Sequence, residues 1–364
     1  MTDKTLTDKT LTDKTSSRKL DHLKLCAASD VHFGSAGFDC VRLVHNAAGG
    51  CDLEETDTGT DLFGHRLSAP LFIEAMTGGH PETKELNRTL AAAAEEGGFA
   101  LGVGSERAAL ENPAVADSFT VVRDAAPNAF IAGNIGAAQL VQHGPEWACR
   151  AVELIDADAL CIHVNTLQEL LQPEGDRCAA GFLSAVSEAA KAVHVPVIVK
   201  ETGAGISREA AKAYFDAGAS AVDVGGFGGT SWAKVELLRK NLLRASDKPQ
   251  QMSEELFLDW GIPTAVSVFE VAQVKCGPVI ASGGLRSGMD AAKSIALGAD
   301  VCGMAKELLS PALEGKGALM NRLSAVVNEL KAVMFLTGAK TIPDLQKVRY
   351  YLTGVVREMT QEIK

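Results

Sequence analysis

The sequence has no dense run of Lys or Arg and no long apolar run. Its 35 Lys and Arg residues stand against 46 Asp and Glu, which gives a net charge of −11 at pH 7. An acidic surface repels the phosphates of nucleic acids, so we expect no nucleic-acid partner. The most apolar stretches, such as 196–199, are far shorter than the roughly 20 residues that a membrane-spanning helix needs. We therefore also expect no insertion into a membrane.

The cysteines lack the spacings that would indicate a disulfide framework or a metal site. The sequence has no Cys-x-x-Cys pair, and no histidine is grouped with a cysteine at the spacing of a metal site. Its N-terminus carries no apolar signal core. These absences favour a cytoplasmic protein with reduced thiols. The eight cysteines are Cys26, Cys40, Cys51, Cys149, Cys161, Cys178, Cys276 and Cys302.

Composition divides the chain into three parts. Residues 1–16 repeat Thr-Asp-Lys-Thr at Thr2, Thr7 and Thr12, and so polar a segment predicts disorder. Residues 17–69 form an N-terminal extension that we expect to complete the functional site. From residue 70 to residue 364, short apolar runs alternate with Ala-rich helical stretches, which is typical of repeated strand–helix units.

Eight apolar runs predict eight parallel strands. Strands that are apolar throughout belong to a sheet buried on both faces, and eight of them with helical crossovers predict an α/β protein of the (β/α)8 TIM-barrel class. A doubly wound open sheet is the alternative. The predicted strands are Leu71–Ala75, Ala100–Val103, Phe130–Gly133, Ala159–Val164, Val197–Val199, Ala221–Val224, Val279–Ala281 and Val301–Gly303. The predicted helices are Glu82–Glu96, Pro145–Leu154, Ala180–Ala192, Arg208–Ala217, Ala265–Val274 and Gly288–Ala296.

Two segments do not fit a simple repeat. Residues 234–260 are too long for an ordinary connection, and long irregular loops are usually lids or disordered, so we expect a lid-like insertion here. After Lys306 the apolar residues recur at helical spacing. We expect C-terminal helices that either wrap the barrel or form a subunit interface.

Polar and glycine residues follow the predicted strands. The carboxyl ends of barrel strands meet at one face, where active sites form. The sixth and seventh strands end in the glycine-rich segments 225–230 and 282–288, and a helix is predicted to begin near Ser287. Backbone N–H groups in such turns, together with a helix N-terminus, form anion sites. We therefore expect a phosphorylated ligand.

The remaining strand ends carry candidates for chemistry. Lys200 ends the fifth strand and must find a negative partner: Glu201, a phosphate or an electron-rich ring. His163, Asn165 and Gln168 follow the fourth strand. A primary amide is no strong base near neutral pH, so if Gln168 assists a proton transfer, another group must supply the basicity. The adjacent Glu169, with water and a substrate phosphate, suits Mg²⁺.

These motifs together resemble the type 2 isopentenyl diphosphate isomerase family, which consists of FMN-dependent (β/α)8 enzymes. The most specific element is His-x-Asn-x-x-Gln-Glu at 163–169. The resemblance covers the chain from about Arg18 to the end of the eighth strand. The other matching segments are 18–22 (RKLDH), 76–79 (MTGG), 104–107 (GSER), 133–136 (GNIG), 199–205 (VKETGAG), 229–232 (GTSW) and 283–288 (GGLRSG).

The resemblance implies an activity and a set of site residues. The family interconverts isopentenyl and dimethylallyl diphosphate by a 1,3-allylic proton shift, using reduced FMN and Mg²⁺. By this resemblance Gln168 is the catalytic candidate, positioning or relaying the proton, and Glu169 is the Mg²⁺ ligand. The implied substrate contacts are Arg18, Lys19, His22, Ser105, Arg107, His163, Asn165 and Gln168. The implied FMN contacts are Ala75, Met76, Thr77, Ser105, Asn134, Lys200, Thr230, Gly284, Leu285, Arg286, Ala305 and Lys306.

The resemblance carries three further expectations. NAD(P)H would reduce the flavin and thereby activate the enzyme. Lys200 would favour the anionic form of the reduced ring. The protein would form a homo-oligomer, a tetramer or larger, with residues 18–22 near a subunit boundary. Glu106 departs from the family pattern, which usually has Gln there, and its charge would either weaken diphosphate binding or pair with Arg107.

Three other functions remain to be weighed. An FMN-dependent 2-hydroxy acid oxidase needs a His and an Arg after the sixth strand, where residues 225–230 contain neither. An enzyme like inosine monophosphate dehydrogenase needs a nucleophilic cysteine in an active-site loop, for which Cys178 is the candidate. A barrel that only binds a flavin or nucleotide would leave the polar cluster at 163–169 unexplained.

Overall fold

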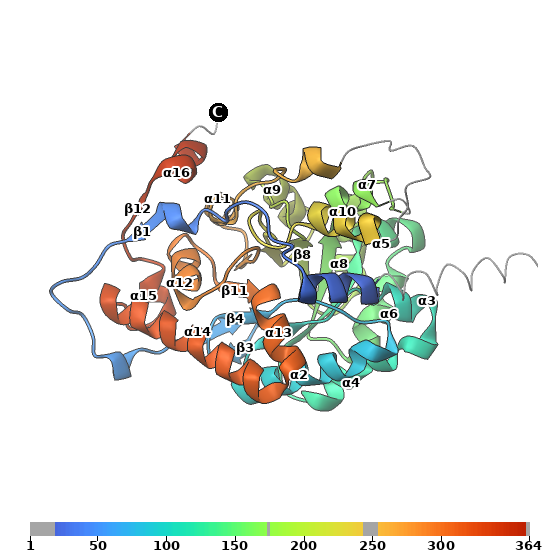
Figure 1. The fold of residues 1–364 in the computed structure, drawn as a ribbon, viewed down its shortest axis with the longest axis horizontal. Helices are drawn as coiled ribbons and strands as arrows, with labels where there is room; N and C mark the ends of the chain where they lie inside the picture. The colour runs from blue at the N-terminus through green and yellow to red at the C-terminus, as the bar shows by residue number, and fades with distance from the viewer. Residues whose placement is uncertain (1–18, 173–174, 243–253, 362–364) are drawn as a thin grey trace, which may run out of the picture.

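Eight parallel strands close into a barrel in the computed structural model of the chain, which describes residues 19–172, 175–242 and 254–361 (Figure 1). The neighbours around the barrel run in the order β10-β11-β4-β5-β6-β7-β8-β9, and β9 pairs with β10 to complete the circle. The (β/α)8 prediction is confirmed, and the open-sheet alternative is wrong. The strands are β4 (Leu71–Ile73), β5 (Ala100–Gly102), β6 (Ile131–Gly136), β7 (Ala159–Val164), β8 (Val197–Glu201), β9 (Ala221–Asp223), β10 (Val279–Ala281) and β11 (Val301–Met304).

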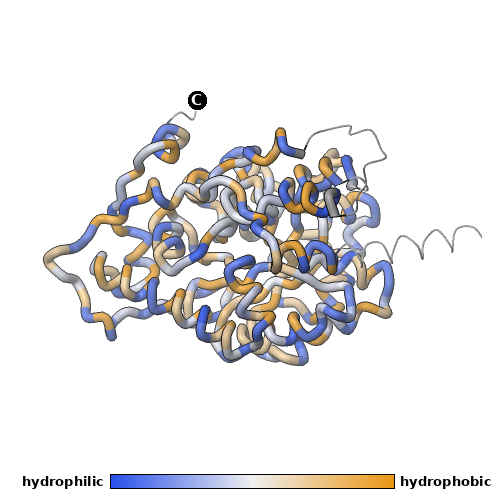
Figure 2. Tube along the Cα trace, viewed as in Figure 1, coloured by the Kyte–Doolittle hydropathy of each residue, from blue (hydrophilic) through white to orange (hydrophobic). Residues whose placement is uncertain are grey.

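Helices surround the barrel, and the six predicted ones are present with small shifts at their ends. The helices between the strands are α2 (Lys84–Gly97), α3 (Arg107–Glu111), α4 (Asp117–Ala125), α5 (Ala137–His143), α6 (Glu146–Ile155), α7 (Thr166–Leu171), α8 (Phe182–Ala192), α9 (Arg208–Asp216), α10 (Trp232–Leu242), α11 (Thr264–Ala272) and α12 (Gly288–Ala296). Four follow β11: α13 (Lys306–Glu314), α14 (Lys316–Thr337), α15 (Ile342–Leu345) and α16 (Gly354–Gln361). Figure 2 shows hydrophobic and hydrophilic residues alternating along these helices, as expected for helices that bury one face.

Three strands run further than predicted, β11 by the single residue Met304 and two others by more. β6 continues to Gly136 and β8 to Glu201, because both extend their pairing with β7. Gly136 pairs with His163, and Glu201 pairs with Val164. Consequently Asn134, Lys200 and Glu201 lie in strands, where the sheet fixes the direction of each side chain.

Alternating side chains of the barrel strands fill two separate cores. On β4, Leu71 and Ile73 pack outward beneath the helices, whereas Phe72 points into the barrel. Both faces of each strand are buried, which explains the apolar runs in the sequence. The hairpin of β2 (Thr60–Leu62) and β3 (His65–Leu67) inserts Leu62 and Leu67 into the interior cluster.

A strand of the N-terminal extension pairs with a strand of the C-terminal region outside the barrel. β1 (Val41–Leu43) pairs antiparallel with β12 (Tyr350–Leu352). α14 packs along α12, α13 and α2, so the C-terminal region wraps the barrel, one of the two placements that the sequence left open. The predicted disorder of residues 1–16 lies outside the described residues.

The segment expected to be a lid-like insertion begins as a helix. α10 covers its first part and buries Val235 against Leu25 and Val31 of the N-terminal extension. A short 3-10 turn, Glu254–Phe257, lies near its end. Residues 234–242 are therefore helical, while the lid-like role expected for the insertion stays a prediction; residues 243–253 lie outside the described part.

Two expectations from the sequence concern the cysteine thiols and membrane-spanning helices. All eight cysteines lie in the described part, and each is a free thiol. Among the described residues, no helix is both long enough and apolar enough to cross a membrane.

Candidate active site

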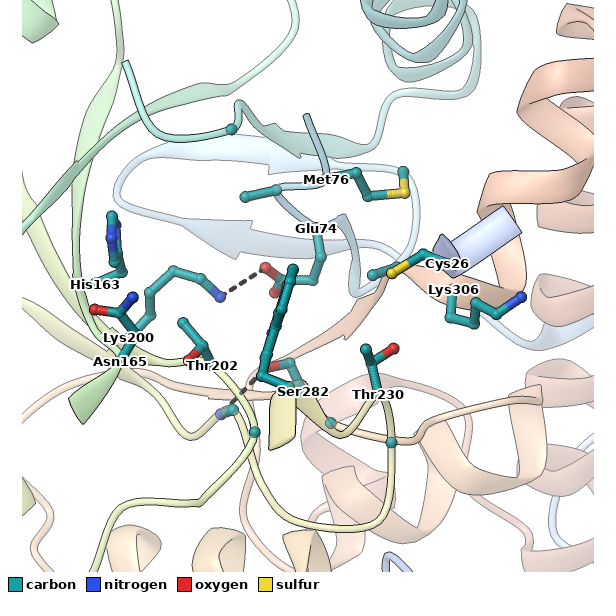
Figure 3. A pocket seen from close by; sticks show the side chains of 18 of the residues that line it. Cys26, Glu74, Met76, His163, Asn165, Lys200, Thr202, Thr230, Ser282 and Lys306 are labelled. Carbon is teal, nitrogen blue, oxygen red and sulfur yellow. Dashed lines mark hydrogen bonds and ion pairs between the residues drawn. The ribbon is translucent and has the colours of Figure 1, made fainter. Parts of the chain in front are cut away.

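A cavity of about 320 Å³ opens at the carboxyl ends of the barrel strands. Every predicted site residue in the described part of the chain lines it; Arg18 lies outside that part. From the N-terminal extension come Lys19 and His22. From the strand ends and following turns come Ala75, Met76, Thr77, Ser105, Arg107, Asn134, His163, Asn165, Gln168, Glu169, Lys200, Thr230, Gly284, Leu285, Arg286, Ala305 and Lys306. Figure 3 shows several of these side chains converging on one space.

Two glycine turns, after β9 and β10, form one wall of the cavity. Gly284 has a left-handed backbone with φ +78°, and a Cβ atom there would collide with the backbone of Gly228. Glycine thus permits the two turns to touch. The guanidinium of Arg286 lies against the His32 ring, with Nη2 2.8 Å from Nε2, and Lys306 adds a second cation to the lining.

The helix N-terminus predicted to join this anion site does not do so. α12 begins at Gly288, whose N–H donates to the Glu329 carboxylate at 2.7 Å. Its cap Ser287 accepts from the Asp290 N–H at 3.2 Å, and the Asp290 carboxylate in turn accepts from the Arg286 N–H at 3.0 Å. Acidic side chains therefore already satisfy this helix end. An anion here must rely on the glycine turns and on the side chains of Arg286 and Lys306.

Lys200 is held by two carboxylates that the sequence analysis did not name. Its Nζ lies 3.0 Å from Glu74 Oε2 and 2.8 Å from Asp223 Oδ2. Although burial opposes the charge, Asp223 and Glu74 raise the pKa of Lys200, so the side chain is an ammonium. Glu201 is not its partner: that carboxylate accepts hydrogen bonds from the N–H groups of residues 202–204.

Alternation along β8 explains why Glu201, one of the three candidate partners, does not contact Lys200. Successive side chains of a strand point to opposite faces, so Lys200 and its neighbour Glu201 cannot share one. Asp223 reaches the ammonium from β9, where it is paired with Lys200, and Glu74 reaches it from the residue after β4. An acidic residue inside an apolar strand, as Asp223 is in residues 221–224, was the signal that could have located them.

His163 is a neutral imidazole with a fixed orientation. Asn134 Nδ2 donates to the Val103 carbonyl at 2.9 Å, so Asn134 Oδ1 is left to accept from His163 Nδ1 at 2.8 Å. Burial, followed by the charges of Lys200, Lys19 and Arg107, lowers the pKa of His163 to about 3. The ring therefore presents Nε2 as a hydrogen-bond acceptor in the ligand-free cavity.

We predict that His163 of the ligand-free protein stays neutral, with the proton on Nδ1, down to about pH 4. The reason is the burial and the three neighbouring cations that lower its pKa to about 3. Nitrogen-resolved NMR of the imidazole rings across pH 4–8 measures both the tautomer and the titration. An imidazole that becomes cationic above pH 6 would contradict this description of the site.

A network around Glu236 orients the amides of the predicted cluster. Glu236 Oε1 lies 2.9 Å from His22 Nε2 and accepts from Gln172 Nε2 at 2.9 Å and Gln168 Nε2 at 3.5 Å. Burial opposes ionisation, but the hydrogen bond and charge of His22 lower the pKa of Glu236, so it is a carboxylate. The sequence analysis missed Glu236, which lies on α10, within the segment expected to be a loop.

Glu169 extends the same cluster. Its Oε1 accepts from Asn165 Nδ2 at 3.0 Å, and its Oε2 accepts from the Asp176 N–H at 2.7 Å. Within the described residues, no group of three or more His, Cys, Asp or Glu side chains is arranged to hold a metal ion. A metal at Glu169 would therefore take most of its ligands from water and from a bound phosphate, which Mg²⁺ accepts.

Glu106 does not pair with Arg107, contrary to one of the two expectations for it. Arg107 Nε donates to Glu111 Oε1 at 2.7 Å, one helical turn away. Glu106 is instead fully buried, and its Oε2 accepts from the Asn134 N–H at 2.7 Å. Burial raises the pKa of Glu106 to about 8, which leaves it neutral at physiological pH.

Comparison with known proteins identifies the family. The profile of the FMN-dependent dehydrogenases matches residues 177–351. The isopentenyl-diphosphate delta-isomerase of Methanoregula boonei is 54% identical over 345 residues, covering 95% of this chain and 96% of that protein. The chain belongs to the type 2 isopentenyl-diphosphate delta-isomerase family. The family member from Halobacterium salinarum is 50% identical over 349 residues, covering 95% of this chain and 96% of its own.

The barrel is also shared with flavin oxidases. A mandelate oxidase variant carrying an FMN adduct superposes with a TM-score of 0.62 at 17% identity, covering 91% of this chain and 95% of its own. That identity shows a common fold and no more. An isopentenyl-diphosphate delta-isomerase does not need the His and Arg of a hydroxy acid oxidase, and residues 225–230 after β9 have neither. Cys178, the candidate nucleophile of the dehydrogenase alternative, is exposed and does not line the cavity.

Proposed function

We propose that the chain interconverts isopentenyl and dimethylallyl diphosphate, a step of isoprenoid biosynthesis, by a 1,3-allylic proton shift that uses FMN and Mg²⁺. The observation that carries the proposal is a single cavity whose two walls differ in chemistry. One wall consists of glycine turns with cations, and the other is the amide and carboxylate cluster of residues 165–169. The names and high identity of the relatives agree with this activity.

The residues of the glycine wall fit FMN. Because the two glycine turns touch each other, a ligand can lie only against their exposed backbone. The positive charges of Arg286 and Lys306 in the cavity lining are complementary to a phosphate. Lys200, fixed by its two carboxylates, offers an ammonium to the ring. When bound and reduced by NAD(P)H, FMN supplies an electron-rich ring that stabilises developing positive charge and a nitrogen that exchanges a proton. Further FMN contacts on this proposal are Ala75, Met76, Thr77, Ser105, Asn134, Thr230, Gly284, Leu285 and Ala305.

The substrate diphosphate would bind between the N-terminal extension and the strand ends. Lys19 Nζ already donates to the Ser105 carbonyl at 2.5 Å, and Arg107 is turned toward the same cavity. His163, Asn165 and His22 complete this side, with Arg18 as a further contact outside the described residues. Two cations and several donors match the charge of a diphosphate.

Gln168 would position the reacting group rather than act as the base. Its Nε2 is oriented by the Glu236 carboxylate, and its Oε1 accepts from Asn165 at 3.3 Å. Because its nitrogen and its oxygen are both hydrogen-bonded, the amide of Gln168 is fixed in one orientation toward a substrate or water. The proton is therefore handled elsewhere, while Gln168 fixes the geometry in which it moves.

Replacing Gln168 with alanine should lower kcat by roughly 100-fold or more, the range for a group that assists proton transfer. The measurement is turnover of isopentenyl diphosphate, with FMN affinity determined in parallel to show an intact cavity. Gln273→Ala, an exposed glutamine outside the cavity, is the control and should keep full turnover. Undiminished turnover of folded, FMN-bound Gln168→Ala would remove Gln168 from the mechanism.

Glu169→Gln should raise the Mg²⁺ concentration that gives half-maximal activity by roughly 10-fold, because the one carboxylate expected to hold the ion loses its charge. Chelation should abolish the activity of the parent, and added Mg²⁺ should restore it. The measurement is a Mg²⁺ titration at fixed substrate. Equal Mg²⁺ dependence of variant and parent would place the ion elsewhere.

An anaerobic assay of isopentenyl diphosphate conversion, with FMN and Mg²⁺, tests the function directly. Dimethylallyl diphosphate should form when the flavin is reduced and not when it is oxidised. The same assay with NADH and NADPH identifies the preferred reductant. Folded, yellow protein that forms no product under either condition would overturn the proposal.

The proposal includes a homo-oligomer of four or more chains in the cytoplasm. Large apolar side chains in the segment after α10 are exposed, including Leu256 at 78% and Trp260 at 61%. Burial of such side chains between subunits would stabilise an assembly. Light scattering of the purified protein measures its mass, and a single-chain mass would contradict this part.

A further inference from the structure

Two carboxyl groups share one ammonium at the base of the cavity. Glu74, which follows β4, contacts Lys200 Nζ on β8 (Figure 3), and Asp223, which ends β9, contacts the same Nζ. All three side chains are buried. With both carboxyls ionised, the group would carry a net charge of −1 in a site with little water, which costs free energy. One proton on one of the two carboxyls removes that charge.

The hydrogen bonds decide which carboxyl holds the proton. Asp223 accepts from Lys200 at 2.8 Å, from the Ser282 hydroxyl, and from the Gly225 N–H at 3.3 Å. Glu74 Oε2 accepts from Lys200 at 3.0 Å, while Glu74 Oε1 has no hydrogen-bond partner among the described residues. Donors stabilise the ionised form, so Asp223 is the carboxylate. Burial, and then Asp223, raise the pKa of Glu74 to about 8.

The remaining neighbours of Glu74 do not supply a partner for Oε1. The titratable group of β7 nearby is Cys161, and burial raises the pKa of its thiol so far that it stays neutral. On β11, Gly303 faces Oε1 so closely that a Cβ there would collide with it. Gly303 and Ser282 both line the cavity, as Glu74 does. The unpartnered oxygen thus lies at the boundary between the barrel interior and the ligand space.

We propose that Glu74 is held as a neutral carboxylic acid and donates a hydrogen bond to an acceptor atom on the ring of the cofactor. The acceptor is a carbonyl oxygen or an unprotonated nitrogen of a heteroaromatic ring, the class to which the FMN of the proposed function belongs. The ammonium of Lys200 then faces the ring, and the group formed by Lys200, Asp223 and neutral Glu74 carries no net negative charge. Glu74 is a cofactor-positioning residue on this view, and the inference rests on FMN binding in this cavity.

FMN binding by the flavin-free protein tests the proposal without any turnover. Quenching of flavin fluorescence gives Kd between pH 7 and pH 9.5, a range in which the FMN phosphate is already ionised. For the parent, Kd should stay constant up to about pH 8 and then weaken, approaching tenfold per pH unit, because only the protonated form binds well. Glu74→Gln keeps a donor that does not ionise, so its Kd should stay constant over the whole range.

Glu106→Gln is the matched control. Glu106 is equally buried and has the same raised pKa, but it does not line the cavity. Its variant should therefore keep the pH dependence of FMN binding seen in the parent. A pH-independent Kd in the parent, or the same alkaline weakening in Glu74→Gln, would overturn the proposal. Absence of FMN binding at every pH in the parent would instead overturn the proposed function.

Infrared spectroscopy provides a second measurement that does not depend on folding of the Glu74 variant. Glu201 is a further buried carboxyl, with a pKa raised by burial to about 7, so both Glu106 and Glu201 are replaced to leave Glu74 as the protonated carboxyl expected at pH 7. Glu106→Gln/Glu201→Gln should then show the carbonyl stretch of a carboxylic acid that disappears above about pH 9 and shifts when FMN binds. A spectrum of this variant without that band at pH 7 would overturn the proposal.

Discussion

Replacing Lys200 with methionine should lower the free energy of unfolding by about 3–5 kcal/mol at pH 7. Methionine fills a similar volume but leaves the buried Asp223 carboxylate without its counter-charge, 2.8 Å away in the parent. The cost is that of an uncompensated buried charge rather than that of a lost contact. Urea unfolding of the two flavin-free proteins measures the difference.

A double variant separates charge from packing in this experiment. Lys200→Met with Asp223→Asn removes both charges and keeps the hydrogen-bonding capacity of residue 223 toward Ser282. It should recover most of the lost stability, because no ion remains buried. A single variant within 1 kcal/mol of the parent, or a double variant no more stable than the single one, would contradict the role assigned to this ion pair.

Glu106→Gln should change the pH dependence of stability. Burial raises the pKa of Glu106 from 4.5 to about 8, so the folded protein binds this proton more tightly than the unfolded chain. The contribution of Glu106 to stability is therefore fully present below pH 4.5 and is lost as the pH rises toward 8. Because glutamine does not titrate, the variant avoids this loss, which is at most about 5 kcal/mol.

The quantity to measure is the difference in unfolding free energy between variant and parent at pH 5, 7 and 9. At pH 5 the variant should be the less stable protein, because the amide buries two N–H donors where the protonated carboxyl buries one O–H, and Glu106 Oε1 has no partner among the described residues. The difference should then move in favour of the variant as the pH rises. A difference that does not change with pH would show that Glu106 ionises normally.

The barrel could be predicted from the sequence because each strand is buried on both faces. Such strands give short, continuous apolar runs, and all eight were found this way. Their ends were less predictable. β6 and β8 continue through polar and glycine residues, since pairing with the long β7 outweighs the preferences of Asn134 and Lys200.

The residues that line the cavity were predictable, but the contacts between their side chains were not. Residues after strand ends converge in any barrel of this kind, so the cavity lining followed from topology. The partners of Lys200 and the network of Glu236 did not, because they join strands and helices that are distant in sequence. The pairing expected between Glu106 and its neighbour Arg107 was wrong for a related reason: the turn after β5 directs Glu106 inward against Asn134.

Antiparallel pairing of β1 with β12 also constrains how the protein is made. Val41 pairs with Leu352, so the first strand leaves the ribosome roughly 300 residues before its partner exists. The preceding segment carries Lys19 and His22, and its anchorage is complete only when the last strand has been synthesised. A nascent chain whose eight barrel strands are complete therefore still lacks one of the two anchors of this N-terminal segment, the other being the packing of Leu25 and Val31 against Val235 of α10.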